Sequence, residues 1–365
     1  MTQLRIPGPT PCPPEVMQAM AWPMINHRGP EYHKMLQEVT EKLKQVFQTK
    51  NDLYILTGSG TGGLEAAVVN TLSPGDKVLS VSVGVFGDRW ANIAKTFGAE
   101  VIPCNFEWGQ AADPEAVARA LKANPAVKAV MVTHNETSTG VTNDLGAIAG
   151  VVKSAGKLLL VDAISSLSSI DLPVDAWGGD VVVTGSQKGW MVPPGLAMAS
   201  VSQEAWKAFE QARMPRFYWD FGKARSYLEK SENPWTPAIS VVFALTVSLE
   251  MIHNEGIKNI FARHARLGKM TREGIKALGL PLFAEEKHAS NTVTAITAAD
   301  GLDGDKLRKI LRTEHGVVLS GGQQKLEGKI FRIGHLGMVS ENDIREVLAA
   351  IKVALPKAGY AAVKK

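Results

Sequence analysis

Lys188 stands alone among apolar residues and could act as an amine nucleophile. It lies in DVVVTGSQKGWMVPPG, residues 180–195, where a buried strand is expected to run into a polar turn. Apolar surroundings disfavour the ammonium form of a lysine, and the neutral amine can attack a carbonyl carbon to form a Schiff base. On this segment alone, an ordinary surface lysine remains the better interpretation.

Asp162 closes the strongly apolar run KLLLV and precedes AISSL. Burying a lone carboxylate is unfavourable, so an acid at the end of a buried strand needs a cation or a hydrogen-bond donor beside it. The position therefore favours a carboxylate that belongs to a site. A helix cap is the alternative, and this segment alone leaves it open.

A glycine-rich segment, Gly58–Gly63, follows the expected strand LYILT and precedes the expected helix LEAAVVNTL. Such a turn exposes backbone N–H groups at the positive end of a helix, where a phosphate can bind. Gly58, Gly60 and Gly63 also match G-x-G-x-x-G, so a dinucleotide site must be weighed. Against it, the next strand, KVLSVSV, reaches Gly84 without an acidic residue for a ribose. A phosphate site is favoured over a merely structural turn, but the glycines do not identify the phosphate.

The segment VTHNETSTGV, residues 132–141, carries a dense group of hydroxyl and amide side chains after an apolar strand. Polar residues at the carboxyl end of a buried strand are typical of ligand sites in α/β sheets. Thr137 or Asn135 could contact a ligand directly. A simple turn at Thr139-Gly140 is the alternative reading.

These segments belong to a regular alternation of strands and helices between about Asp52 and Ser200. The expected strands are apolar throughout rather than alternating, which indicates a mostly parallel sheet covered by helices on both faces. Asp113, followed by Pro114 and Glu115, predicts a helix start. Ligands of such a sheet bind at the carboxyl ends of its strands.

Lys188, Asp162 and the glycine-rich segment each follow a strand of this sheet, so their groups can converge on one crevice. A pyridine aldehyde cofactor needs this set: an amine for its carbonyl carbon, a carboxylate for its ring nitrogen and a donor-rich cradle for its phosphate. A nicotinamide dinucleotide needs no such lysine. The combination favours the first cofactor.

Composition limits the remaining possibilities. The chain has 365 residues, 45% hydrophobic and 21% charged, which suits a large globular domain with a smaller one. Its net charge of +4 is scattered, without the basic stripe of a nucleic-acid-binding protein. Cys12 and Cys104 are too few for a disulfide framework or a four-cysteine zinc site, so no metal is expected. No signal-peptide core and no apolar run of about 18 residues is found, which predicts a soluble, cytoplasmic protein without a membrane partner.

Five segments are recognisable together: GSGTGGLEAAVVNTLSPGD, THNETSTGV, VDAISSL, GSQKGWMVPPGLA and FRIGHLG. In order and spacing they resemble the class V aminotransferases of fold type I, in particular the alanine/serine-glyoxylate aminotransferase group. The resemblance runs from GPTP near the N-terminus to FRIGHLG and covers most of the chain.

The resemblance implies an α/β fold, that of the fold-type I transferases dependent on pyridoxal 5'-phosphate (PLP). A large domain with a mostly parallel seven-stranded sheet would span residues 21–255, and a smaller α+β domain residues 256–365. Residues 1–20 would form an arm that packs on the small domain and on a dimer partner. The domain change is placed in the helical stretch that starts at Pro237.

The same resemblance assigns roles to single residues. Lys188 is similar to the Schiff-base lysine and Asp162 to the partner of the pyridinium nitrogen. The implied cofactor contacts are Ser59, Gly60, Thr61 and Gln187 at the phosphate, Phe86 on the ring face, Thr137 near the ring oxygen, and Thr236 at the phosphate of the partner subunit of a homodimer. Arg332 and Gly8 are implied at the substrate, where the forked donors of an arginine suit a carboxylate.

Three positions depart from the family's common residues. A histidine often stands at the position of Thr61, a tryptophan at that of Phe86 and a tyrosine at that of Asn233. Phosphate contacts and ring stacking can therefore differ in detail. Phe86 as a core aromatic and Thr236 as a helix cap before Pro237 remain the simpler alternatives.

The expected reaction is a ping-pong transamination through an aldimine on Lys188, from alanine or serine to glyoxylate or pyruvate. Aspartate or ureidoglycine as the donor, or a lyase of the same class, are alternatives. A cysteine desulfurase needs a nucleophilic cysteine on a mobile loop, and no cysteine follows Cys104. An NAD-dependent oxidoreductase and a cofactor-binding module without catalysis are the more distant rivals.

Overall fold

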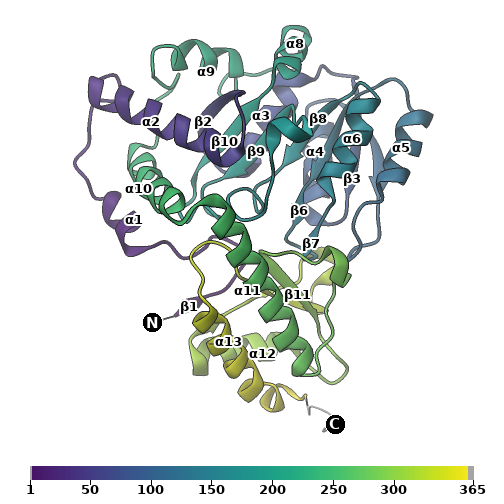
Figure 1. Cartoon of the computed structure of the whole chain (residues 1–365). Helices are drawn as coiled ribbons and strands as arrows, with labels where there is room; N and C mark the ends of the chain where they lie inside the picture. The colour runs from purple at the N-terminus through teal and green to yellow at the C-terminus, as the bar shows by residue number, and fades with distance from the viewer. Residues whose placement is uncertain (1, 361–365) are drawn as a thin grey trace.

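The computed structural model describes residues 2–360. Figure 1 shows a wide part, built on one large sheet with helices on both faces, above a narrower part that contains the C-terminal helices. The N-terminal strand lies beside the narrower part.

The large sheet has seven strands in the order β2-β10-β9-β8-β5-β3-β4. Their bounds are β2 (Asp52–Gly58), β3 (Lys77–Ser82), β4 (Glu100–Asn105), β5 (Val127–Thr133), β8 (Leu158–Asp162), β9 (Val181–Gly185) and β10 (Gly195–Val201). β10 runs antiparallel to both of its neighbours, and all other neighbouring pairs are parallel. The expectation of a mostly parallel, seven-stranded sheet is confirmed.

Helices bury both faces of this sheet, as the unbroken apolar strands predict. In β5, Val130 and Val132 face one hydrophobic core, whereas Ala129 and Met131 face the other. The first core is covered by α2 (Pro30–Phe47), α5 (Pro114–Ala123), α6 (Leu145–Ser154) and α10 (Ile239–Glu255). The second is covered by α3 (Gly60–Thr71), α4 (Val85–Thr96), α8 (Gln203–Gln211) and α9 (Phe221–Leu228).

Some helices begin where the sequence predicts, and others begin about one turn earlier. Asp113 accepts a hydrogen bond from the N–H of Glu115 and begins α5 as predicted. By contrast, α3 and α4 begin at Gly60 and Val85, earlier than the helical runs from Leu64 and Asp88 that the sequence indicates. The added turns belong to the site described below.

The C-terminal part begins after Gly256, a glycine with a φ angle of 82° that joins α10 to α11 (Ile257–Ala277). An antiparallel sheet in the order β11-β14-β13 forms its centre. Its elements are β11 (Val293–Thr297), α12 (Gly304–His315), β12 (Val317–Val318), β13 (Ser320–Gly321), β14 (Ile330–Gly334), α13 (Glu341–Ala354) and the short helices η1 (Glu286–His288), η2 (Gln324–Leu326) and η3 (Pro356–Ala358). This is an α+β arrangement that ends in a helix.

The N-terminal segment is bound to the C-terminal part of its own chain. β1 (Gln3–Leu4) pairs in parallel with β12, and Arg5 forms an ion pair with Asp343. Further along, α1 (Pro14–Ala19) packs on α10. The remaining short elements are β6 (Asn135–Glu136), β7 (Val141–Thr142) and α7 (Val174–Trp177). The division into an arm, a large and a small domain at residues 20 and 255 stays a prediction.

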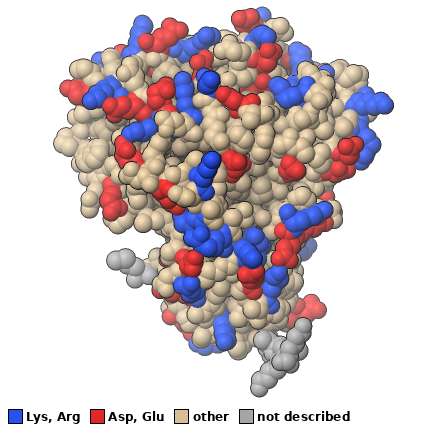
Figure 2. Space-filling model, in the orientation of Figure 1, with Lys and Arg blue, Asp and Glu red and all other residues tan. Residues whose placement is uncertain are grey.

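The surface carries charges of both signs. Figure 2 shows lysine and arginine side chains interspersed with aspartate and glutamate on the face in view. Within residues 2–360, every helix is too short or too polar to cross a membrane.

Candidate active site

A cavity of about 260 Å³ lies at the edge of the large sheet where β2, β3, β5, β8 and β9 end. Gly8 from the N-terminal segment and Gln323 from the C-terminal part complete its wall. The predicted site residues that line it are Gly8, Gly60, Thr61, Phe86, Thr137, Asp162, Gln187 and Lys188. Larger open grooves of about 650 and 620 Å³ lie elsewhere on the surface, away from these residues.

Lys188 follows β9, in the turn that leaves the sheet. Its Nζ donates a hydrogen bond to the carbonyl oxygen of Pro7, at 2.7 Å. Burial lowers the pKa of Lys188 to about 8, although the nearby carboxyl group of Asp162 opposes the shift. A Cβ atom at Gly8 would lie 2.5 Å from Nζ, so a glycine there leaves room for the amine. The amine therefore gives up its proton far more readily than an ordinary lysine, although the ammonium form still predominates below pH 8.

Asp162 is the last residue of β8 and is 3% exposed. Its Oδ1 accepts a hydrogen bond from the N–H of Ile164, at 2.9 Å, and Oδ2 accepts none from residues 2–360. Burial raises the pKa of Asp162 to about 7, and the hydrogen bond from Ile164 only partly opposes this. The carboxyl group thus presents one unused oxygen to the cavity that Lys188 also lines.

The glycine-rich segment is the first turn of α3 rather than a loop before it. Ser59 is the exposed N-cap residue and does not line the cavity, whereas Gly60 and Thr61 do. The backbone N–H groups of Gly60 and Thr61 form no hydrogen bond within the described chain. Free N–H groups at the positive end of a helix are suited to an anion. Nearby, the buried Oε1 of Gln187 also has no partner among residues 2–360.

The polar segment after β5 contributes two residues to the wall, in different ways. Thr137 lines the cavity, and its hydroxyl forms no hydrogen bond to residues 2–360. The amide of Asn135 also lines it, but its nitrogen donates to Ser165 and Thr292, and its oxygen accepts from Thr142 and Ser290. Of the two residues expected to contact a ligand, only Thr137 has a free side-chain group.

Glu136 explains why α4 begins three residues early, and the sequence did not single it out. Its side chain is fully buried, and Oε2 accepts hydrogen bonds from the N–H groups of Phe86 and Gly87 at 3.0 and 3.2 Å. The hydroxyl of Ser138 accepts from the N–H of Val85 at 3.0 Å. Side chains some 50 residues away in the sequence therefore cap the first turn of α4.

Phe86 lines the cavity from this capped turn. The guanidinium carbon of Arg89, one turn later, lies 4.8 Å from the centroid of the Phe86 ring. Arg89 also lines the cavity and adds positive charge that lowers the pKa of Lys188 further, after the main effect of burial. Phe86 is thus held through both its backbone and its ring.

Arg332 lies in the centre of β14, is 6% exposed, and adjoins the wall residue Gln323 without itself lining the cavity. Its Nε donates to the carbonyl oxygen of Gly321 and its Nη1 to that of Thr137, both at 2.9 Å. Nη1 also reaches Oε1 of Gln323, a wall residue, at 3.3 Å. Nη2 donates to no acceptor among residues 2–360. Burial lowers the pKa of Arg332 to about 10, and the residue remains cationic at neutral pH.

Thr236, which is expected to contact the partner subunit's cofactor, and Asn233, which departs from the family's common tyrosine, do not line the cavity. Thr236 is exposed on this chain. Asn233 donates to the carbonyl oxygen of Ile55 at 3.0 Å and accepts from the hydroxyl of Tyr32 at 2.5 Å. Asn233 thus links the chain's own elements.

Further wall residues were not named by the sequence reasoning. Ile164 and Ser165 follow Asp162 directly in VDAISSL, and Arg89 follows Phe86 by one helical turn, so local spacing could have indicated them. Leu64 and Gln323 carry no such signal. Among residues 2–360, no group of three or more histidine, cysteine, aspartate or glutamate side chains could hold a metal ion.

Replacing Glu136 by glutamine should destabilise the protein. Each carboxyl oxygen of Glu136 now accepts two hydrogen bonds. In either orientation of the new amide, its NH2 group would replace one of these oxygens and would face two hydrogen-bond donors. We expect a loss of about 1–3 kcal/mol in the free energy of unfolding, measured by urea denaturation. As a control, Glu41→Gln changes a side chain that is 70% exposed and should shift stability by less than about 0.5 kcal/mol. Unchanged stability of Glu136→Gln would contradict the capping role.

The chain is similar to known proteins over nearly its whole length. The family model "Aminotransferase class-V" matches residues 4–339. The chain is 46% identical to a protein of Anabaena cylindrica named soluble hydrogenase 42 kDa subunit, over 98% of this chain and 94% of that one. It is 38% identical to the serine–glyoxylate aminotransferase of Methylorubrum extorquens, over 96% and 90% of the two chains.

A solved structure, the alanine–glyoxylate aminotransferase of a Nostoc species, superposes with a TM-score of 0.94 at 30% identity, covering 97% of this chain and 95% of that one. The fold is that of the fold-type I PLP-dependent transferases. The family model spans the segment from the N-terminal strand to beyond Arg332, and so includes every residue that lines the cavity. The chain belongs to the class V aminotransferases and is a transaminase.

Proposed function

We propose that this transaminase uses PLP to move an amino group from alanine or serine to glyoxylate or pyruvate by a ping-pong mechanism. The observation that carries the proposal is the convergence of Lys188 and Asp162 on one cavity, beside the free N–H groups of Gly60 and Thr61. An amine, a carboxyl and an anion cradle are the three groups that this cofactor requires.

The residues present fit the cofactor. Its phosphate would be held by the N–H groups of Gly60 and Thr61 at the start of α3. Gln187 would add its side-chain amide, whose buried oxygen has no hydrogen-bond partner among residues 2–360. The amide can turn to present its NH2 group to the phosphate. Ser59, the exposed N-cap residue directly before Gly60, would add a further contact to the phosphate.

Bound PLP supplies an electrophilic carbon and an electron-withdrawing ring. Asp162 would hold a proton at the ring nitrogen, because its free oxygen is buried and needs a cationic or donor partner. The free hydroxyl of Thr137 would donate near the ring oxygen. Phe86 would contact the ring face, held in place by Glu136 and Arg89.

Lys188 would serve both as the covalent anchor of the cofactor and as the base that moves the substrate's α-proton. A pKa of about 8 suits the second task, because the amine can accept and return a proton near neutral pH. The carbonyl oxygen of Pro7 orients Nζ in the cavity.

Arg332 would bind the carboxylate that all amino and keto acid substrates share. Its Nε and Nη1 are fixed by carbonyl oxygens, which leaves Nη2 to meet a substrate oxygen. Gln323 borders the cavity beside it and would help to place the carboxylate. Gly8 would leave space for the substrate next to Lys188.

We further propose a homodimer with shared active sites, located in the cytoplasm. Trp22, Met24, Phe217 and Tyr218 are large apolar side chains that are 43–67% exposed, which favours a partner surface. Thr236, exposed on this chain, would reach the phosphate of the partner subunit's cofactor. The two free cysteines, Cys12 and Cys104, suit a reducing compartment.

The amino donor is the least constrained part of the proposal. Serine, alanine, aspartate and ureidoglycine all occur as donors in the names of similar enzymes, and all four carry the α-carboxylate that Arg332 would bind. A panel of these donors against glyoxylate, pyruvate and 2-oxoglutarate would rank them. Activity with none of these pairs would contradict the proposed reaction.

Replacing Lys188 by alanine should abolish transamination, because both the covalent anchor and the base are lost. We expect turnover to fall by at least about a thousandfold, while PLP still binds non-covalently in equilibrium dialysis. Lys34→Ala, at a side chain that is 79% exposed, is the control and should keep full activity. Substantial turnover by the Lys188 variant would remove Lys188 from the chemistry.

Covalent capture of PLP by the protein should follow the ionisation of Lys188. Only the neutral amine attacks the aldehyde. The rate should therefore rise with pH, reach half of its maximum near pH 8 and level off at higher pH. Stopped-flow absorbance of the apoprotein mixed with PLP measures this profile. A midpoint near the ordinary lysine value of 10.5 would show that burial does not perturb the amine.

Replacing Arg332 by alanine should raise the KM for amino donor and keto acid together. The loss of a charged hydrogen bond corresponds to about a 10- to 100-fold rise in each KM. Because Arg332 also ties β14 to Gly321 and Thr137, the PLP dissociation constant should be measured alongside and should stay nearly constant. Unchanged KM values for both substrates would exclude Arg332 from the carboxylate site.

A further inference from the structure

We propose that Trp219 is a positioning residue for the cofactor's phosphate: its indole packs on two glycines and holds the first turn of α3 in place. This inference rests on the proposed function, because it assigns PLP's phosphate to that turn. Trp219 lies between α8 and α9, far from α3 in the sequence.

The indole of Trp219 occupies the space that side chains at Gly58 and Gly62 would need. A Cβ atom at Gly62 would lie 2.6 Å from Cζ2 of Trp219, and one at Gly58 would lie 2.6 Å from Cη2. Neither glycine has a positive φ angle, so the neighbouring indole, not the backbone conformation, excludes a side chain. The two glycines flank Ser59, Gly60 and Thr61, the predicted phosphate contacts.

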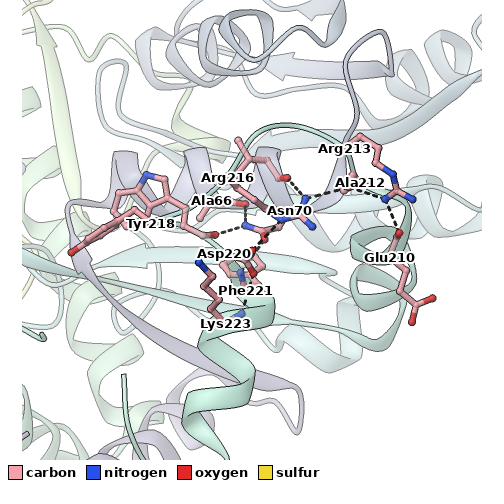
Figure 3. A network of polar contacts seen from close by, with 12 residues as sticks. Ala66, Asn70, Glu210, Ala212, Arg213, Arg216, Tyr218, Asp220, Phe221 and Lys223 are labelled. Carbon is pink, nitrogen blue, oxygen red and sulfur yellow. Dashed lines mark hydrogen bonds and ion pairs between the residues drawn. The ribbon is translucent and has the colours of Figure 1, made fainter. Parts of the chain in front are cut away.

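Asn70, fully buried in the last turns of α3, binds the backbone directly after the Trp219 side chain (Figure 3). Its Nδ2 donates to the carbonyl oxygen of Trp219 at 2.5 Å, and its Oδ1 accepts from the N–H of Phe221 at 2.9 Å. Nδ2 also donates to the carbonyl oxygen of Ala66, within α3, at 2.8 Å. One side chain therefore joins the helix to the segment that carries the indole.

Arg216 makes a second attachment of the same segment, also visible in Figure 3. Its Nη1 donates to the carbonyl oxygen of Val69 at 3.0 Å and to that of Ala212 at 3.3 Å. Asp220 lies 3.8 Å from the Arg216 guanidinium and caps α9 by accepting from the N–H of Lys223. The segment is thus tied to the end of α3 by its backbone and by the Arg216 side chain, while its indole contacts the start of the helix.

On the other side of the turn, Ile164 contacts Gly60. A Cβ atom at Gly60 would lie 2.5 Å from Cδ1 of Ile164, the residue whose N–H binds Asp162. The first turn of α3 is therefore packed between Trp219 and the segment that follows Asp162. This packing sets the position of the free N–H groups of Gly60 and Thr61 relative to the Asp162 carboxyl.

A methyl group at Gly62 should therefore displace the turn by way of Trp219. We expect Gly62→Ala to raise the dissociation constant of PLP by about tenfold, because overpacking must shift the N–H groups or the indole. Pyridoxal, which lacks the phosphate, should bind as it does to the wild type. The double variant Gly62→Ala/Trp219→Leu vacates the space and should bind PLP more tightly than Gly62→Ala alone.

The control is Gly150→Ala in α6, where an added Cβ atom would meet nothing within 4 Å. It should leave the dissociation constants of PLP and pyridoxal unchanged. At saturating PLP, the KM of Gly62→Ala for the amino donor should match that of the wild type, since the substrate carboxylate site is untouched. A general loss of structure would instead weaken PLP and pyridoxal alike.

Three results would overturn the positioning role: wild-type affinity of Gly62→Ala for PLP, an equal loss for pyridoxal, or no recovery in the double variant. A different result would overturn the proposed function: a wild-type protein that binds no PLP at all. The wild-type titration therefore separates failure of the proposed function from failure of this inference.

Discussion

The burial of an amine and a carboxyl group at the ends of two adjacent parallel strands is the constraint on which the site depends. Lys188 follows β9 and Asp162 ends β8, and these strands pair directly. Burial shifts the two pKa values toward each other, to about 8 and about 7, so both groups can exchange protons near neutral pH. Such shifts are typical of catalytic sites.

The rest of the wall is positioned by contacts between distant segments. Glu136 and Ser138 cap the first turn of α4 and thereby place Phe86 and Arg89. The first turn of α3 is likewise fixed by neighbours outside the helix, of which Trp219 is the one we propose as functional. In both helices the turn that faces the cavity carries little helical signal of its own, and side chains from other elements stabilise it.

This division explains what the sequence could predict. Apolar runs such as KLLLV and DVVVTG indicate buried strands by themselves, and a lone Asp162 or Lys188 at their ends is a local signal. Glu136, Gln323 and the contact of the Trp219 indole with two glycines depend on tertiary packing, which no local pattern encodes. The role proposed for Thr236 would require a second subunit, and the choice of donor depends on the few groups around a small substrate.

The central claim is that Lys188 is the amine that binds PLP in this transaminase. Borohydride reduction of the protein after incubation with PLP, followed by peptide mass spectrometry, measures this directly. We expect a phosphopyridoxyl group on the peptide that contains Lys188 and on no other lysine-containing peptide. A stoichiometric label on a different lysine, or no label at all, would contradict the claim.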